Sequence, residues 1–418
     1  MIKILWFSLT PCNSINRRKE KVIRAGWLMS LENKIKESPD IELSVAYFSD
    51  VDEPSYDYDG VRYFPMYRKA YSNPLARVVN RYRARKYNKD IKNMLGVIAD
   101  FKPDVIHIHG TEECFGYVAK YVVDIPVIYS IQGLISSYTL KYFSGIPHSV
   151  TRSYSKLTDY IRRVSYLDYY KYFKDRSDRE CEFLKNAKYV LGRTFWDRRI
   201  CELFNPDVRY YVSNEILRPQ FYKNEWKKDA FNKKLKIVTT SSDGLYKGFE
   251  SILRTAALLK RFADFDFEWI VIGIEKNSKI VDLAEKYTKL QAENCHVVVA
   301  GMADADRVVD ILLNADIYCQ VSHIENSPNS LCEALMLGLP CVATYAGGTG
   351  SLMTNGEDGL LVQDGDPYVM AGSIVDMQKD VSRAKEYGAA ARKRALKRHD
   401  MADIAAGLIG IYKNVLNL

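Results

Sequence analysis

The sequence predicts an α/β protein with two doubly wound, parallel-sheet domains, and three observations support this fold class. The chain has 418 residues, which is more than one hydrophobic core usually organises. Short apolar runs alternate with segments of helical periodicity, as in parallel sheets covered by helices. A polar, lysine-rich and poorly periodic stretch, residues 213–235, separates two such series. We interpret this stretch as the linker between two domains.

The first series predicts an N-terminal domain over residues 1–212. Helices are expected over 17–37 and 75–100. Strands are expected at IKILWFSL, ELSVAYFS, VRYFPMY, PDVIHIHG, IPVIYSIQG and, closing this half, NAKYVLGRT. The amino terminus alternates like a strand and lacks a small-residue cleavage site, so we do not expect a signal peptide.

The second series predicts a C-terminal domain over residues 236–395. Its strands are expected at LKIVTTSS, FEWIVIGI, HVVVAG, DIYCQVS and PCVATYA. Helices are expected over 248–262, 277–291, 304–314 and 328–338. We expect a last helix, 396–418, to pack back on the N-terminal domain. Because such sheets bind ligands beyond the carboxyl ends of their strands, a central cleft between the domains is the expected site.

The composition predicts a globular, cytoplasmic protein. Apolar residues make up 47% and charged residues 27% of the chain, both ordinary values. No run of eighteen apolar residues occurs, so a membrane-spanning helix is not expected. The eight cysteines show no C-x-x-C spacing, which favours reduced thiols. His107 and His109 alternate on one face of an expected strand, and no metal site is expected.

The positive charge is confined to one half of the chain. The net charge is +8, and residues 1–210 hold 35 Lys and Arg against 25 Asp and Glu. A basic half suits an anionic partner such as a membrane face, a nucleic acid or a phosphate-bearing substrate. Because no recognition motif for nucleic acid occurs, we do not expect that partner. Residues 68–92 are basic, and residues 152–174 are basic and tyrosine-rich; both segments predict a peripheral contact with an anionic membrane, with a solvated helix surface as the alternative.

The stretch HIENSPNSLCEALMLGLP places Glu325 and Glu333 just after an expected strand. Ser327 at the cap and Pro328 at the first helical position predict a helix start. Glu325 then lies in the loop and Glu333 lies in the helix. Two structural roles stay open: a solvated loop acid for Glu325, and a capping box of Ser330 with Glu333. In the functional interpretation, both carboxylates accept hydrogen bonds from the hydroxyls of a sugar-like ligand.

Two glycine-rich turns follow expected strands on either side of this diacid. SSDGLYKGFES contains Gly244, Gly248 and Lys247 and opens a helix, whose N-terminus favours an anion. ATYAGGTGS, residues 343–351, offers backbone N–H groups to phosphate. Either turn alone is also consistent with an ordinary loop. Together with the diacid they indicate a nucleotide diphosphate that bears a polyol.

At these residues the sequence resembles retaining glycosyltransferases of the GT-B fold, in the family-4-like group that builds lipopolysaccharide and capsule. The resemblance is strong over 235–375 and weaker over the N-terminal half. Its most specific part runs from Glu325 through EALMLGLPCVATYAGG to NGEDGLLVQDGD. It implies that Glu333 holds the ribose hydroxyls, Glu325 the donor sugar and Lys247 the diphosphate. Further contacts to the nucleotide are implied for Gly244, Gly301, Met302, Asn329, Ser330, Gly347, Gly348 and Thr349.

The sequence departs from the family pattern at two positions. Ser242 stands where the family usually has a phosphate-binding arginine, so one bidentate contact is missing. Arg193 is a candidate to compensate for it. Gln132 stands where the family often has a histidine near the donor sugar; it can donate a hydrogen bond but cannot carry a proton. His109 is the alternative catalytic candidate, and a satisfied sheet histidine is the structural one.

The resemblance implies transfer of a sugar, with retention, from a nucleotide diphosphate donor to an acceptor hydroxyl. It implies a UDP-sugar, with a GDP-sugar as the alternative, and neither metal nor cofactor. No protein nucleophile is evident, so we expect front-face displacement in which the leaving phosphate takes the acceptor proton. A glycan or lipid-linked glycan of bacterial surface polysaccharide is the implied acceptor. A GT-B nucleotide-sugar epimerase and a nucleotide-sugar-binding protein of weak catalytic power stay open as alternatives.

Overall fold

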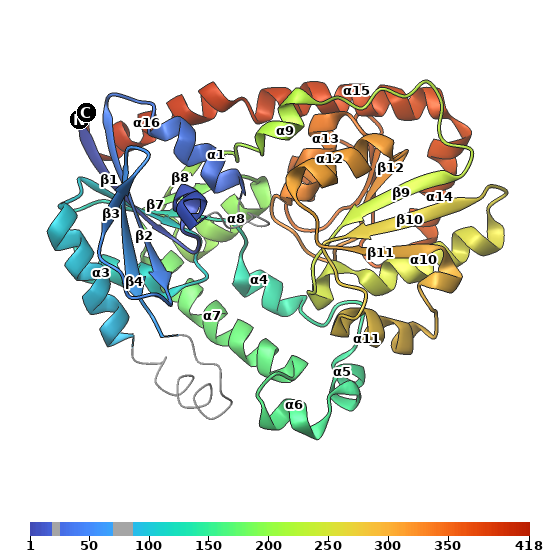
Figure 1. Ribbon diagram of the computed structural model, residues 1–418, viewed down its shortest axis with the longest axis horizontal. Coiled ribbons are helices and arrows are strands. Elements are labelled where there is room, and N and C mark those ends of the chain that lie inside the picture. The colour runs from blue at the N-terminus through green and yellow to red at the C-terminus, as the bar shows by residue number, and fades with distance from the viewer. Residues whose placement is uncertain (19–25, 70–86) are drawn as a thin grey trace. The chain divides into compact units, whose positions relative to one another are not determined.

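The computed structural model describes residues 1–18, 26–69 and 87–418 and divides into two units, each with its own sheet (Figure 1). The first unit comprises Met1–Thr139, Ser155–Ile216 and Asp400–Leu418, and the second comprises Leu140–Tyr154 and Leu217–His399. Two α/β units with Rossmann-like sheets confirm the predicted fold class. Residues 140–154, however, belong to the second unit and not to an unbroken N-terminal domain over 1–212. Most of the basic segment 68–92 lies outside the described residues.

The sheet of the first unit has eight strands within the described residues, in the order β3-β4-β2-β1-β5-β6-β7-β8. The strands are β1 (Ile2–Ser8), β2 (Ile41–Ser49), β3 (Tyr56–Tyr58), β4 (Val61–Tyr67), β5 (Val105–His109), β6 (Val127–Ser130), β7 (Tyr189–Gly192) and β8 (Arg209–Val212). Neighbours are parallel except β3 and β4, which are antiparallel. All six predicted strands are present. The sequence analysis missed β3 and β8, which are short edge strands with partly exposed side chains.

The helices of the first unit include two that begin with a capping box. These helices are α1 (Gly26–Ile35), α3 (Asn88–Phe101), α4 (Ile135–Leu140), α6 (Leu157–Ile161), α7 (Tyr166–Asn186), α8 (Phe195–Phe204) and α16 (Met401–Val415), with 3-10 turns η1 (Cys12–Arg18) and η2 (Cys114–Lys120). In α7 the side chain of Ser165 accepts from the backbone N–H of Asp168, and in α8 Thr194 accepts from Asp197. Each cap satisfies an N–H group that the helix itself leaves unpaired.

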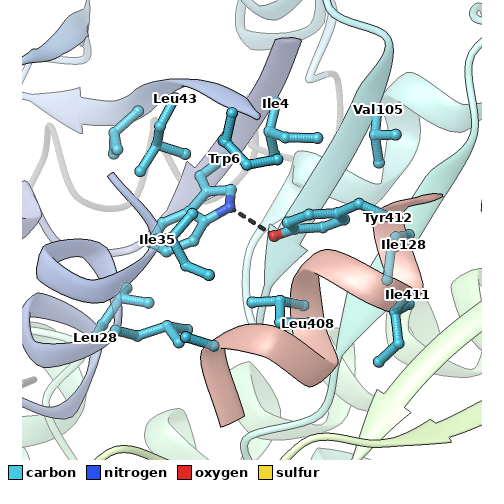
Figure 2. Packing of buried hydrophobic residues seen from close by; sticks show 14 of the residues in the cluster. Ile4, Trp6, Leu28, Ile35, Leu43, Val105, Ile128, Leu408, Ile411 and Tyr412 are labelled. Atoms are coloured by element: carbon cyan, nitrogen blue, oxygen red, sulfur yellow. Dashed lines mark hydrogen bonds between the residues drawn. The ribbon is translucent and has the colours of Figure 1, made fainter. Parts of the chain in front are cut away.

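Helix α16 contributes to the core of the first unit. Trp6 of β1 donates a hydrogen bond from Nε1 to Tyr412 Oη at 3.0 Å, and the same oxygen lies 2.7 Å from His107 Nδ1. Figure 2 shows Trp6 and Tyr412 pointing toward each other among aliphatic side chains that include Ile35 and Leu408. Both aromatic side chains are fully buried. The last residues of the chain therefore pack against its first strand.

The second unit has six parallel strands within the described residues, in the order β11-β10-β9-β12-β13-β14. The strands are β9 (Leu235–Thr240), β10 (Phe267–Ile272), β11 (Val297–Gly301), β12 (Ile317–Gln320), β13 (Cys341–Thr344) and β14 (Leu360–Val362). The five predicted strands are confirmed, and the three-residue edge strand β14 was not predicted. All carboxyl ends meet at one edge of the sheet because the strands are parallel.

The helices of the second unit agree with the four that the sequence predicts and add others. They are α5 (His148–Tyr154), α9 (Pro219–Lys223), α10 (Phe249–Phe262), α11 (Lys279–Thr288), α12 (Ala305–Asn314), α13 (Asn329–Leu337), α14 (Pro367–Lys379) and α15 (Val381–Arg398), with 3-10 turns η3 (Leu245–Lys247), η4 (Glu293–Cys295) and η5 (Thr349–Ser351). Among the described residues, no helix combines the length and the apolar character that a bilayer-spanning segment requires. All eight cysteines are free, as predicted.

The stretch that the sequence analysis interpreted as a linker, 213–235, is largely a packed part of the second unit. It contains α9, which packs against α12 and α13. Phe221 and Trp226 are buried in the core of that unit. The Trp226 backbone N–H donates to Leu337 O at 2.8 Å. Many lysines surround these apolar residues and make the composition of the stretch polar. The buried side chains therefore show no helical or strand periodicity in the sequence.

Candidate functional site

Two neighbouring strands of the second sheet bring Lys247 and Glu325 together. Lys247 follows β9, and Glu325 follows β12, the strand beside it. Lys247 Nζ donates to Glu325 Oε1 at 2.5 Å. Burial alone lowers the pKa of Lys247, but the charge of Glu325 outweighs that effect and raises the pKa above its ordinary value. Lys247 is therefore a cation at neutral pH.

The carboxylate of Glu325 is buried, which rules out the alternative of a solvated loop acid. The residue is 4% exposed. Gln320 Nε2 lies 3.4 Å from Glu325 Oε1, and the backbone N–H of Gly348 donates to Glu325 O at 2.8 Å. A Cβ at Gly347 would lie 2.0 Å from that same carbonyl oxygen. The glycine-rich turn after β13 can therefore lie directly against the Glu325 loop only because residue 347 has no side chain.

The structure rules out the alternative of a capping box of Ser330 with Glu333. Helix α13 begins at Asn329, and Pro328 is the cap residue without a side-chain hydrogen bond. Ser327 is thus not the cap, and Pro328 stands one position before the first helical residue. The Ser330 hydroxyl donates instead to Gln320 Oε1, at 3.4 Å. The carboxylate of Glu333 is available for another role.

Glu333 forms a bidentate ion pair with Arg218, a residue that the sequence analysis missed. Arg218 Nε donates to Oε1 at 2.7 Å and its terminal nitrogen donates to Oε2 at 2.8 Å. The Glu333 side chain is 7% exposed and that of Arg218 is 20% exposed. Burial raises the pKa of Glu333, and the hydrogen bonds and charge of Arg218 oppose that rise. The two residues are 115 positions apart, so no local pattern could have paired them.

The other predicted nucleotide contacts lie at the same edge of the sheet. Gly301 ends β11 with a positive φ of 77°, and the Met302 backbone N–H lies 3.3 Å from Glu275 Oε1. Gly244 precedes η3 with an ordinary φ of −74°. Thr349 starts η5 after β13 and donates its hydroxyl to a backbone oxygen.

Asn329, another of the predicted nucleotide contacts, has a buried acceptor atom without a hydrogen-bond partner. It is the first residue of α13, and its Oδ1 is buried without a hydrogen-bond partner. A buried acceptor without a partner costs free energy. A ligand that donates to it would remove that cost.

Gln132 and His109 belong to the first unit, where each follows or ends a strand. His109 is 1% exposed, and neither ring nitrogen has a hydrogen-bond partner. Burial lowers the pKa of His109 far below its ordinary value, and the charges of His107 and Arg193 lower it further. The ring is therefore neutral and a weak base. Arg193, the candidate for compensating Ser242, is buried and pairs with Glu215 at 3.4 Å.

A second buried charge cluster, also missed from the sequence, lies beside Glu325. His323 Nε2 lies 2.7 Å from Glu250 Oε1, and its Nδ1 lies 3.5 Å from Asp364 Oδ2. Burial lowers the pKa of His323, but Asp364 and Glu250 outweigh that effect and raise it to about 9. Lys141 also reaches Asp364, at 3.4 Å. Lys141 thus links residues 140–154 to the cluster, and both belong to the second unit.

Comparison with known proteins identifies the part of the chain that carries the Lys247–Glu325 pair. Residues 221–394 match the family described as glycosyl transferases group 1. This part of the second unit is therefore similar in sequence to glycosyl transferases of group 1. The match begins within α9, so Arg218 lies just before it, and it includes all six strands of the second sheet.

Curated relatives of this protein include proteins that match most of the chain. The capsular polysaccharide biosynthesis glycosyltransferase CapM of Staphylococcus aureus is 23% identical, over 83% of this chain and 87% of its own length. The uncharacterized glycosyltransferase MJ1178 of Methanocaldococcus jannaschii is 23% identical, over 87% of both chains. N-acetyl-alpha-D-glucosaminyl L-malate synthase of Bacillus anthracis is 27% identical over 164 residues, and this chain spans only 43% of its length.

Solved structures show the same fold over the full chain. Sucrose-phosphate synthase of Thermosynechococcus elongatus superimposes with a TM-score of 0.73 at 13% identity and covers 100% of both chains. HepE of Anabaena, solved in complex with UDP and glucose, gives a TM-score of 0.65 at 16% identity, again over 100% of both chains. At these identities the likeness establishes the GT-B fold of the chain.

Proposed function

We propose that the protein moves a sugar from a nucleotide diphosphate donor to an acceptor hydroxyl with retention of configuration. The observation that carries this proposal is the Lys247–Glu325 pair at the ends of β9 and β12. One side chain is a partly buried cation suited to a diphosphate, and the other is a buried carboxylate suited to sugar hydroxyls.

The second unit supplies the donor site in this proposal. Lys247 stabilises the negative charge that develops on the leaving diphosphate. Glu325 accepts hydrogen bonds from the donor sugar, and Glu333 accepts them from the ribose. The backbone N–H group of Gly347 adds a further donor to the phosphates. Because these groups are fixed before the donor binds, little reorganisation accompanies the reaction.

We assign the nucleotide as UDP. Support comes from relatives of the same fold, since HepE was solved in complex with UDP-glucose and TarM of S. aureus in complex with UDP. A side chain that would act as a nucleophile on the sugar is not required, because the leaving phosphate takes the acceptor proton in a front-face displacement. Lys247 supplies the positive charge, so the reaction needs no divalent metal.

The acceptor is a glycan of bacterial surface polysaccharide, carried on a lipid at an anionic membrane face. The similarity to CapM supports the pathway. The surface of α6 and α7 supports the membrane contact, because Leu157, Ile161 and Tyr169 are 77%, 65% and 50% exposed beside exposed cations at Lys156 and Arg162. Apolar and tyrosine side chains next to cations suit a lipid interface.

The test is calorimetry with UDP, GDP and ADP in the absence of divalent metal, followed by a donor assay. We expect UDP to bind most tightly. Release of UDP from a UDP-sugar should rise when a glycan acceptor extract is added. Failure of all three nucleotides to bind would refute the donor site. Release of free UDP that is independent of acceptor, with formation of an epimeric sugar, would favour an epimerase.

A further inference from the structure

The Arg218–Glu333 pair combines three features that a surface ion pair does not have. Its two hydrogen bonds run in parallel, at 2.7 and 2.8 Å. Its carboxylate is nearly inaccessible to solvent, at 7% exposure. It also joins the residue expected to hold the ribose to a segment outside the sheet. A bidentate guanidinium fixes the plane of a carboxylate as well as its charge.

The segment that carries Arg218 is held rigidly on the second unit. Pro219 begins α9 directly after Arg218, and the Arg218 guanidinium lies 4.9 Å from the centre of the Phe221 ring. Phe221 is fully buried. Tyr222 accepts from the Leu217 N–H at 3.1 Å and donates to His399 O at 2.7 Å. The packing and hydrogen bonds of this segment thus fix the position from which the Arg218 side chain contacts Glu333.

Burial acts against an ionised Glu333. The residue lies in α13 between apolar core side chains, and a desolvated carboxyl favours its neutral form. Within the described residues, the ionisable groups that interact electrostatically with Glu333 are Arg218 at the start of α9 and the Tyr318 phenol of β12. Burial raises the pKa of Tyr318 above its ordinary value, so the phenol is neutral. The positive charge at Glu333 comes from Arg218.

We propose that Arg218 is a positioning residue for donor recognition, which keeps the buried Glu333 ionised and oriented to accept hydrogen bonds from a ribose diol. Nε and one terminal nitrogen of Arg218 each occupy one lone-pair direction of the carboxylate, which leaves two acceptor directions for a ribose diol. A protonated Glu333 would lose acceptor capacity, and an unpaired one would be free to rotate. This inference rests on the proposed donor function.

The first experiment measures the Glu333 carboxyl without any nucleotide. Protein labelled with 13C at the glutamate side chains is titrated by NMR, and the Glu333 signal is assigned with Glu333→Gln. We expect the carboxyl to titrate at a higher pH in Arg218→Met than in the wild type. Arg218→Lys should stay close to the wild type, because it keeps the charge. Arg254→Met, which removes a cation stacked on Tyr287 in the same unit, is the matched control and should change nothing.

The second experiment measures UDP-glucose affinity at pH 6 and pH 8.5. The diphosphate of this probe is esterified at both ends and takes up no proton in that range. Arg218→Met should bind about tenfold more weakly at pH 6 than at pH 8.5, since a protonated Glu333 loses a charged hydrogen-bond acceptor. The wild type, Arg218→Lys and Arg254→Met should show equal affinity at both pH values. If Arg218→Met does not fold, Arg218→Gln replaces it.

Each result separates the inference from the donor assignment. An unchanged Glu333 titration in Arg218→Met overturns the inference. An affinity loss of the same size at both pH values also overturns it, because Arg218 would then contact the nucleotide directly or act only on the fold. If the wild type binds no UDP-glucose, the donor assignment fails, and the titration still decides whether Arg218 holds Glu333 ionised.

Discussion

Glu325 and Glu333 have different partners, and the difference predicts different effects of the same substitution. Glu333→Gln should weaken UDP binding by about tenfold, because an amide is a poorer acceptor for a diol than a carboxylate. Glu325→Gln should leave UDP binding almost unchanged but lower transfer by about 100-fold, the usual size for losing one contact to the reacting group. Calorimetry and a UDP-release assay measure the two effects separately.

The control for both variants is Glu357→Gln. The Glu357 carboxylate is largely exposed, and its ion pair with Arg394 is long, at 3.8 Å. It should match the wild type in both assays. Equal loss of UDP affinity in both variants would contradict the division between ribose and sugar contacts. A lower melting temperature with intact UDP affinity in Glu333→Gln would assign that residue a purely structural role.

His323 predicts a loss of stability at alkaline pH. Its pKa is about 9 in the fold and 6.5 when unperturbed, so the folded state binds the proton more tightly. The stabilisation is complete below about pH 6.5 and disappears as the pH rises through about 9, with an upper size of about 3 kcal/mol. Urea unfolding of the wild type and His323→Gln at pH 6 and pH 10 measures it. The difference between the two proteins should shrink at pH 10, and a constant difference would contradict the charged state of His323.

At the scale of elements, we expect the packing of α9 against the core of the second unit to stabilise the donor site. Phe221 is fully buried between α9 and the core of the second unit. Phe221→Ala should therefore cost about 3–5 kcal/mol of unfolding free energy. Phe262→Ala, at the end of α10 where the ring is 69% exposed, is the matched control and should cost less than about 1 kcal/mol. Similar losses in the two variants would show that α9 is not an integral part of the unit.

The helices α6 and α7 carry the prediction about membranes. Replacing Lys156 and Arg162 by Ser should weaken sedimentation with anionic vesicles by about thirtyfold, since each cation contributes about 1 kcal/mol near such a surface. Replacing Leu157 and Ile161 by Ser should weaken it further. Leu203→Ser on α8, where the side chain is 79% exposed, is the control. Equal binding to neutral and anionic vesicles, or binding that is unaffected by salt, would contradict an electrostatic contact.

Most strands could be predicted from the sequence because parallel strands are buried on both faces and form continuous apolar runs. Edge strands such as β8 and β14 lack that signal. The Asp59–Gly60 turn between β3 and β4, with positive φ at both residues, is the local signal that does mark an edge hairpin. Local patterns also placed Glu325, Lys247 and the glycine turns at strand ends.

The partners of these residues could not be predicted in the same way. The Arg218–Glu333 pair and the Lys247–Glu325 pair join residues 115 and 78 positions apart. Side-chain pairing at such separations depends on the strand order and on the packing of α9, which no local spacing encodes. The capping-box alternative could not be decided from the sequence for a related reason, because a motif of four residues cannot specify where the helix begins.

At the scale of the whole molecule, the first unit is built from three separate segments of the chain. These are Met1–Thr139, Ser155–Ile216 and Asp400–Leu418. Those last residues complete a core that the first strand begins. Tyr412 Oη accepts from Trp6 and also bonds His107, and burial lowers the pKa of His107 to about 3. The His107 ring is therefore neutral, and its two buried nitrogens are satisfied by hydrogen bonds with Tyr412 and Ser130.

Tyr412→Phe should lower the unfolding free energy by about 2 kcal/mol, because it leaves the buried Trp6 N–H and one His107 nitrogen without a partner. Tyr211→Phe is the control. It removes a hydroxyl of β8 that bonds Asn414 of α16 at 2.7 Å near the surface, and it should cost less than about 0.5 kcal/mol of unfolding free energy. Urea unfolding followed by fluorescence measures both. Removal of residues 400–418 should expose the apolar cluster around Trp6 and make the protein insoluble. If Tyr412→Phe costs no more than Tyr211→Phe, the hydrogen bonds of Tyr412 do not stabilise the first unit; a soluble, folded protein without residues 400–418 would show that α16 is not part of its core.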